Sequence, residues 1–418
     1  MKGNVRAQIQ KVAPAIFVCI FFGAIFAFGF NVQTQKSTES YPEAQAIVNH
    51  GSSVGELQTY LKEIAVKKGA LYAFEVLRRA KLPPQTDVHL LGHAVGDELY
   101  KQYGKEGIQY CTSEFRNACS HTVVVGLLLD FGVGALDDIS EACKKAPGGI
   151  GAYAMCFHGL GHGVLAYEQY DLEKTVALCK KTGTDEFHNQ EFAQCIGGAV
   201  MESIAGGGHD RKAWVEARPR FLNKENPLSP CNLAFMPEEV RSYCYVYLTP
   251  HLIEVAGGDM GRPDPKLFPK AFSYCRTLPE SDPNREVCIN SFGKEFVGWA
   301  RTSDGRDIAT LTDKELTLMT SWCAMAGNEK DSYFCLQGIQ RYIYWGGEND
   351  PKQSVRYCTF LGAQKKETGS KCFSDLAGLV SGYVKDAVKR KEICALFPKN
   401  KKDECVSIQE TRALNTAH

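Results

Sequence analysis

The stretch Cys156-Phe-His-Gly-Leu-Gly-His162 sets the pattern on which the chain is built. Its two histidines are four residues apart, so they lie on one face if the segment is helical. Two upstream segments repeat parts of it, His89-Leu-Leu-Gly-His93 and Cys119-Ser-His121. When the segments are aligned on their cysteines and glycines, His89, His121 and His158 take one equivalent position. His93 and His162 lie one turn further on.

The cysteines extend this repetition over most of the chain. Of the 17 cysteines, sixteen fall into neighbouring pairs, which we expect to be disulfides: Cys111 with Cys119, Cys143 with Cys156, Cys179 with Cys195, Cys231 with Cys244, Cys275 with Cys288, Cys323 with Cys335, Cys358 with Cys372, and Cys394 with Cys405. Successive pairs begin 32 to 52 residues apart, which is the period of helical hairpin repeats. So many cysteines without tight C-x-x-C pairs indicate an oxidising compartment.

Each cysteine pair has the same surroundings. A short helix ends at the first cysteine, as in Leu172–Cys179; a polar loop follows, and the second cysteine begins a more apolar helix. A disulfide across a loop of about fifteen residues is worth about 3 kcal/mol. We therefore predict an all-α fold, an α-solenoid of disulfide-stapled hairpins over residues 52–410. Histidine-rich repeats occupy about 52–208 and C-terminal repeats about 231–410. The sequence alone does not fix the disulfide connectivity.

Two segments carry a family resemblance. Glu141-Ala-Cys143 with Cys156-x-x-Gly-x-Gly, and Ala177-Leu-Cys179-Lys-Lys with Cys195-Ile-Gly-Gly, resemble cysteine-rich Sel1-like repeats. Across about residues 105–405, this resemblance implies helix pairs linked by a disulfide, a right-handed superhelix related to tetratricopeptide arrays, and a binding scaffold. Only Cys111 to Cys119 has the short spacing typical of that family, and the histidine set is not part of its pattern.

The N-terminus predicts export. Residues 12–30 are uncharged and apolar, and Lys2, Arg6 and Lys11 precede them. A run of this length just spans a bilayer, and the positive flank stays inside. We expect a cytoplasmic segment 1–11, a transmembrane signal anchor 12–30 containing the unpaired Cys19, and a linker 31–51. The main body then lies outside the cytoplasm, in a periplasmic or extracellular space. A signal peptide cleaved near Ala27-Phe-Gly29 is the alternative.

Charge composition limits the partners. Lys and Arg number 48, as do Asp and Glu, so no basic field favours nucleic acid. No phosphate loop, G-x-S-x-G elbow or dinucleotide fingerprint is present in the sequence. The expected partners are therefore the membrane, through the N-terminal helix, and an exported protein or peptide.

The repeated histidines predict a metal site. Histidines at i and i+4 can bind a metal ion in a bidentate manner. The glutamate of the H-E-x-x-H protease motif is missing, which excludes that motif. Glycines that interrupt these helices indicate close backbones, which would bring successive histidine pairs together. The expected ligands are His89, His93, His121, His158, His162 and Asp97, with Glu98 or Glu202 as weaker candidates. One or two ions of Zn, Fe or Cu suit such a set. Whether the metal serves an enzyme reaction is left open.

The competing interpretation is a scaffold that binds an exported protein or peptide. In that case the histidines only form hydrogen bonds within the protein core and bind no metal. The remaining histidines fit no repeat position and are expected on the surface or in loops: His50, His188, His209, His251 and His418. The arginine-rich insertion between Gly208 and Cys231 is expected to be a long loop, either on a binding face or simply solvated.

Overall fold

A computed structural model describes residues 41–50, 53–82, 86–112, 114–206, 211–260, 263–301, 310–346, 351–384 and 386–415. The chain divides into two units, Met1–Pro42 and Glu43–His418. The predicted cytoplasmic segment, the anchor at 12–30 and Cys19 lie outside the described residues, as does most of the predicted linker. The second unit is all-helical: its described residues contain an isolated bridge between Asn223 and Asn226 but no strand.

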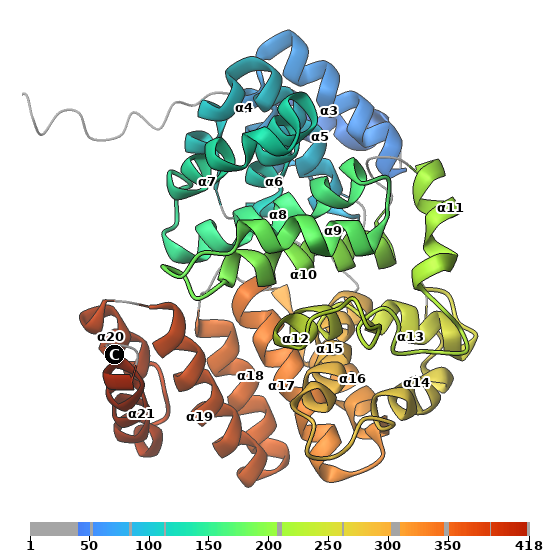
Figure 1. Cartoon of the computed structure of the whole chain (residues 1–418). Helices are drawn as coiled ribbons and strands as arrows, with labels where there is room; N and C mark the ends of the chain where they lie inside the picture. The colour runs from blue at the N-terminus through green and yellow to red at the C-terminus, as the bar shows by residue number, and fades with distance from the viewer. Residues whose placement is uncertain are drawn as a thin grey trace, which may run out of the picture. The chain divides into compact units, whose positions relative to one another are not determined.

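The N-terminal half of the second unit contains the helices that carry the repeated histidines. They are α3 (Val54–Lys68), α4 (Ala70–Arg79), α5 (Val88–Tyr103), α6 (Glu114–Phe131), α7 (Leu136–Lys144), α8 (Ile150–Tyr167), α9 (Leu172–Cys179), α10 (Gln190–Ala205) and α11 (Arg211–Phe221), preceded by the short α2 (Pro42–Ala46). The long helices pack in chain order, α3 on α5, α5 on α6, α6 on α8 and α8 on α10 (Figure 1).

Local sequence signals explain where these helices begin and which face they bury. Ser53 and Glu56 form a capping box at the start of α3, which satisfies backbone N–H groups of the first turn. Leu57, Leu61 and Ile64 then recur at helical spacing and are buried. The apolar stripe of α3 faces α5 and α4.

The C-terminal half continues the same serial packing. Its helices are α12 (Arg241–Tyr245), α13 (Thr249–Ala256), α14 (Phe268–Cys275), α15 (Pro283–Ala300), α16 (Asp313–Cys323), α17 (Glu329–Gly346), α18 (Pro351–Gln364), α19 (Lys366–Tyr383), α20 (Ala387–Ala395) and α21 (Lys402–Asn415). Helix α10 contacts α12, α12 contacts α15, and α15 packs on α17; α17 contacts α18 and α19, and α19 packs on α21.

Disulfides join all sixteen of the paired cysteines within the predicted neighbouring pairs. The Cα atoms of each pair are 5.3 to 5.7 Å apart. The bonds link Cys111 with Cys119, Cys143 with Cys156, Cys179 with Cys195, Cys231 with Cys244, Cys275 with Cys288, Cys323 with Cys335, Cys358 with Cys372, and Cys394 with Cys405. The prediction of local staples is confirmed, and eight disulfides indicate an oxidising, extracytoplasmic environment.

Most of these disulfides hold a helical hairpin across its loop. They join the end of one helix to the early turns of the next, as Cys179 of α9 does with Cys195 of α10. Cys358 departs from the expected helix end, because α18 continues for six residues beyond it to Gln364 before Cys372 follows in α19. Cys231 also differs, because it lies in irregular chain rather than at the end of a helix. Its partner Cys244 lies in the short α12.

Glycines allow two pairs of long helices to cross closely. A Cβ atom on Gly161 of α8 would lie 2.0 Å from the carbonyl oxygen of Cys195, and one on Gly198 of α10 would lie 1.8 Å from that of His158. Gly293 of α15 and Gly338 of α17 meet the equivalent carbonyls at 2.0 and 1.9 Å. The predicted role of glycine in close backbone approach is therefore confirmed for α8.

One described segment, Glu114–Lys144, is long and apolar enough to cross a membrane by length and composition. It includes α6, which packs between α5 and α8, and 56% of its most apolar window is buried inside the protein. Burial between helices of the same unit accounts for this apolar character without a bilayer.

The insertion predicted as a loop contains a helix. In α11, Trp214 is only 6% exposed and packs with Leu165, Tyr170 and Phe221. Its indole Nε1 donates to the carbonyls of Glu202 and Ser203 at 3.0 and 2.9 Å. The prediction failed because the burial of this tryptophan depends on α8 and α10, which the local sequence does not reveal.

Candidate metal centre

The repeated histidines meet between three helices. Helix α5 carries His89 and His93, α6 carries His121, and α8 carries His158 and His162. All except the half-buried His93 are buried. The contacting ring centroids within this set are 4.4 to 6.4 Å apart. The structure thus brings all five predicted imidazoles together.

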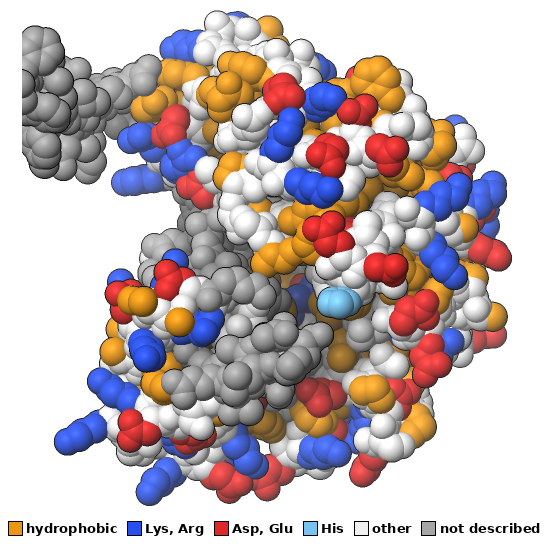
Figure 2. All heavy atoms as spheres, turned by 60° about the vertical axis from the view of Figure 1, so that its left-hand side comes forward, with side chains coloured by type: hydrophobic (Ala, Val, Ile, Leu, Met, Phe, Trp, Pro, Cys, Tyr) orange, Lys and Arg blue, Asp and Glu red, His pale blue; other side chains and the backbone are white. Residues whose placement is uncertain are grey.

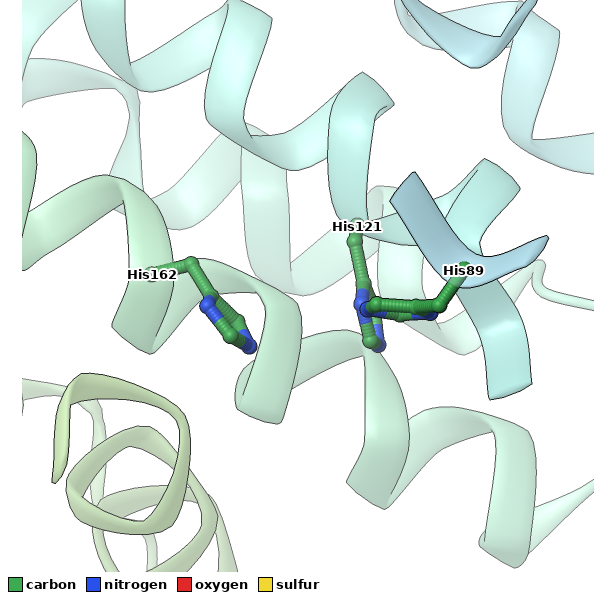
Figure 3. A group of neighbouring side chains, drawn as sticks. All are labelled: His89, His121 and His162. Atoms are coloured by element: carbon green, nitrogen blue, oxygen red, sulfur yellow. The ribbon is translucent and has the colours of Figure 1, made fainter. Parts of the chain in front are cut away.

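Three of these histidines form the group that could hold one ion. One ring nitrogen each from His89, His121 and His162 lies within 4.8 Å of the others, and their rings extend into the space between their helices (Figure 3). Metal–nitrogen bonds of 2.0–2.1 Å place ligand nitrogens roughly 3.3 Å apart, so modest side-chain rotation would complete the geometry. We call these residues the three-histidine group.

His89 is oriented by a backbone carbonyl. Its Nδ1 lies 2.7 Å from the carbonyl oxygen of Phe115, to which it would donate, while its buried Nε2 has no hydrogen-bond partner in the described structure. Phe115, Arg116 and Asn117 all adopt left-handed conformations, with φ between 55° and 60°. Such a turn is unfavourable for residues other than glycine and is typical of functional sites. Here it presents the carbonyl that fixes the tautomer of His89.

His162 is oriented by a buried carboxylate. Its Nδ1 lies 3.0 Å from Oε2 of Glu202, and the hydroxyl of Tyr170 donates to Oε1 at 3.3 Å. Nε2 of His162 is buried and has no hydrogen-bond partner among the described residues. A histidine that donates one N–H to a carboxylate while its other nitrogen remains available is the usual arrangement at metal sites. Glu202, a weaker ligand candidate in the sequence, instead orients a histidine of the three-histidine group.

Burial keeps most of these imidazoles neutral. Removal from water, together with the charge of Arg116, lowers the pKa of His89 to about 4. Burial and the neighbouring histidines hold the pKa values of His121 and His158 well below the ordinary value. Neutral imidazoles have the lone pairs that a metal ion requires. Both ring nitrogens of His121 are buried without a hydrogen-bond partner in the described residues, a costly arrangement that a bound cation would relieve at one of the two nitrogens.

The other two acidic candidates, Asp97 and Glu98, are not part of the three-histidine group. The carboxylate of Asp97 is 41% exposed and lies 3.9 Å from Nζ of Lys62, outside the three-histidine group. Glu98 is buried but accepts a hydrogen bond from Lys101 at 2.6 Å. Their sequence spacing from His93 was the reason for naming them, but it did not reveal the lysine that pairs with each.

Two of the other histidines can be compared with the prediction. His188 is exposed, as expected. His251 is only 2% exposed in α13, where its Nδ1 lies 3.8 Å from Oε2 of Glu254, so the expectation of a surface position is wrong for this residue. It is buried by neighbouring helices that its local sequence does not reveal.

Several residues around the cluster were missed by sequence reasoning. They are Phe115, whose carbonyl binds His89, Tyr170, which binds Glu202, Tyr247, whose ring lies 5.4 Å from that of His158, and the nearby cations Arg116 and Lys294. The sequence contains part of this information, because Lys294 lies six residues after Cys288, as His162 lies six residues after Cys156.

Comparisons with known proteins add no assignment: no protein-family model, no curated protein and no solved structure matches this chain.

Proposed function

We propose that this chain is a membrane-anchored, exported α-solenoid that binds a transition-metal ion through His89, His121 and His162. The observation that carries the proposal is the convergence of these buried ring nitrogens, two of them on imidazoles whose other nitrogen is already held by Phe115 or Glu202. A buried cluster of neutral imidazoles without a cation would leave lone pairs unsatisfied.

The donor set fits Zn, Fe or Cu, all of which accept imidazole ligands. Three protein ligands leave a coordination position for solvent or substrate, where a metal ion acts as a Lewis acid or redox centre. His93 and His158 lie beside the group, at ring centroid distances of 4.4 Å from His89 and 5.2 Å from His162. They would hold a second ion or border the open position.

The solenoid and the anchor belong to the same proposal. Serial packing of disulfide-stapled helical pairs supports a solenoid, and the apolar residues 12–30 after a basic segment support the anchor. The rival proposal, favoured by the same stapled hairpins, is the Sel1-like scaffold that binds an exported protein or peptide without metal.

Elemental analysis of the full-length chain, purified under oxidising conditions, tests the proposal. We expect at least one equivalent of Zn, Fe or Cu, lost from the double variant His89→Ala, His162→Ala and retained in His188→Ala, whose exposed histidine lies outside the cluster. Circular dichroism checks that the double variant remains helical. Wild-type protein of normal stability that neither contains nor takes up metal would exclude the proposal and favour the scaffold.

A further inference from the structure

The C-terminal half repeats the geometry of the histidine-bearing helices. In the α15 and α17 pair, Gly293 and Gly338 make the same close crossing that Gly161 and Gly198 make between α8 and α10. This common register defines equivalent positions along the two helix pairs. Three residues of the metal centre and its surroundings then have counterparts: Asn290 for His158, Lys294 for His162 and Tyr342 for Glu202.

One of these counterparts, Lys294, lies near the histidine cluster. Nζ of Lys294 lies 4.5 Å from the centre of the Tyr247 ring, and that ring is 5.4 Å from the ring of His158. The charge of Lys294 contributes to the lowered pKa of His158, after burial and the neighbouring His162 and His89. The C-terminal half thus contributes a charged side chain to the surroundings of the histidine cluster, which itself belongs to the N-terminal half.

Arg116 lies in the same surroundings and is attached directly to the site. It follows Phe115, whose carbonyl oxygen holds His89, in the left-handed turn at the start of α6. Its side chain is exposed to solvent, yet the groups that act on its charge come from several segments: Tyr342, Asp87, Glu295 and Tyr247. Arg116 is thus an exposed cation directly adjoining the turn that holds His89.

The neighbouring carboxylates are already engaged. Asp87 accepts hydrogen bonds from the backbone N–H groups of His89 and Leu90 as the N-cap of α5, and Glu295 lies 2.5 Å from Nζ of Lys294. Asp87 and Glu295, the two carboxylates that act on the charge of Arg116, thus already have other partners. On the face shown in Figure 2, acidic and basic side chains are interspersed. Arg116 therefore has hydrogen-bond donors available for an external acceptor.

We propose that the ligand of the three-histidine centre carries an oxyanion, a carboxylate or phosphate group, that Arg116 binds through its guanidinium. The proposal rests on the metal site proposed above and names the class of ligand that would occupy its open side. A planar guanidinium with free donors matches the two oxygens of such a group.

Calorimetric titration of the zinc-loaded, full-length chain with inorganic phosphate and, separately, with acetate tests the inference. We expect Arg116→Gln to weaken binding of the preferred anion by about tenfold or more, because a hydrogen bond to a charged group is worth about 1.5–3 kcal/mol. Arg116→Lys retains the positive charge but lacks the planar guanidinium with its paired donors. Its affinity for the anion should therefore fall between those of the wild type and Arg116→Gln. Arg220→Gln, at an exposed arginine of α11, is the matched control and should bind normally.

Zinc content and helicity are measured on the same samples. Normal zinc content with anion binding unchanged in Arg116→Gln, or absent from the wild type, would overturn the anion site and leave the metal site intact. Failure of the wild type to take up zinc would overturn both. Tighter binding of phosphate or of acetate identifies which oxyanion the site prefers.

Discussion

At the scale of single residues, predicting the histidine cluster requires two kinds of information: which histidines converge, and which groups orient them. Repeat position in the sequence predicted which histidines would converge, and the structure places all five together. The groups that orient them could not be predicted, because the carbonyl of Phe115 and the carboxylate of Glu202 reach their histidines only through tertiary packing. For Asp97, sequence spacing was misleading: its interval from His93 suggested a ligand, but its carboxylate is partly exposed and lies beside Lys62.

Glu202→Gln tests the orienting role of this carboxylate. We expect metal affinity to fall by about 10- to 100-fold, because His162 loses the charged acceptor for its Nδ1. Competition with a chromophoric chelator measures the affinity. The control Glu191→Gln changes another buried glutamate of α10, which binds Tyr153 and Thr184 outside the cluster, and should retain wild-type affinity. Equal losses in the two variants would contradict the assigned role.

A second residue-scale prediction concerns Glu254. Burial acts to raise its pKa, but nearby His251 and the Arg218 guanidinium outweigh burial and lower the pKa to about 2, below its ordinary value of 4.5. The carboxylate therefore contributes stability that is fully present above pH 4.5 and is lost as the pH falls toward 2. Urea unfolding should show that Glu254→Gln destabilises the protein less at about pH 3 than at about pH 6. A destabilisation that does not change with pH would contradict this assignment.

At the scale of secondary-structure elements, the helices and their staples were largely predictable. Apolar residues at helical spacing, such as Leu57 and Leu61, identified buried faces, and cysteine positions identified the ends of α7, α9, α14, α16 and α20. Glycines in α8 predicted close backbones, and Gly161 confirms this. Helix α11 was missed because Trp214 is buried against helices distant in sequence and Pro219 interrupts its local pattern.

Alanine at the close crossings should destabilise the fold. Gly161→Ala and Gly293→Ala each place a Cβ atom 2.0 Å from a carbonyl oxygen, so the helices must separate at a cost of about 1–3 kcal/mol. Gly151→Ala in α8 and Gly298→Ala in α15 are matched controls with no atom within 4 Å of the added Cβ, and they should be neutral or stabilising. Denaturant unfolding measures the difference. A similar stability for all four variants would refute the close-crossing argument.

At the scale of the whole molecule, two sets of repeat features have different distributions. Disulfides run along the chain from Cys111 to Cys405, whereas the clustered histidines are confined to α5, α6 and α8. The disulfides therefore stabilise hairpins along the described chain, and the candidate metal site is confined to these three helices. This division was predictable from sequence, because cysteines and histidines can be counted by repeat. The approach of Lys294 to the cluster was not, because it depends on how distant repeats pack.

Because eight disulfides close local loops, we expect the stability of the protein to depend strongly on their remaining oxidised. Each closed loop contributes about 3 kcal/mol, so reduction of several disulfides should remove more stability than an ordinary domain has. We expect reductant to lower the melting temperature sharply, which calorimetry with and without reductant measures. Peptide mapping of the unreduced protein should recover the eight local pairs, including those of the C-terminal repeats such as Cys323 with Cys335 and Cys394 with Cys405. Extensive long-range pairs, or an unchanged melting temperature after complete reduction, would contradict the arrangement.

The most direct test of the central claim is X-ray absorption at the edge of the metal bound by the full-length chain. We expect a first shell with three imidazole nitrogens at about 2.0–2.1 Å from zinc, reduced by one in His121→Ala. A shell made only of oxygen or sulfur atoms, or one unchanged by His121→Ala, would contradict it.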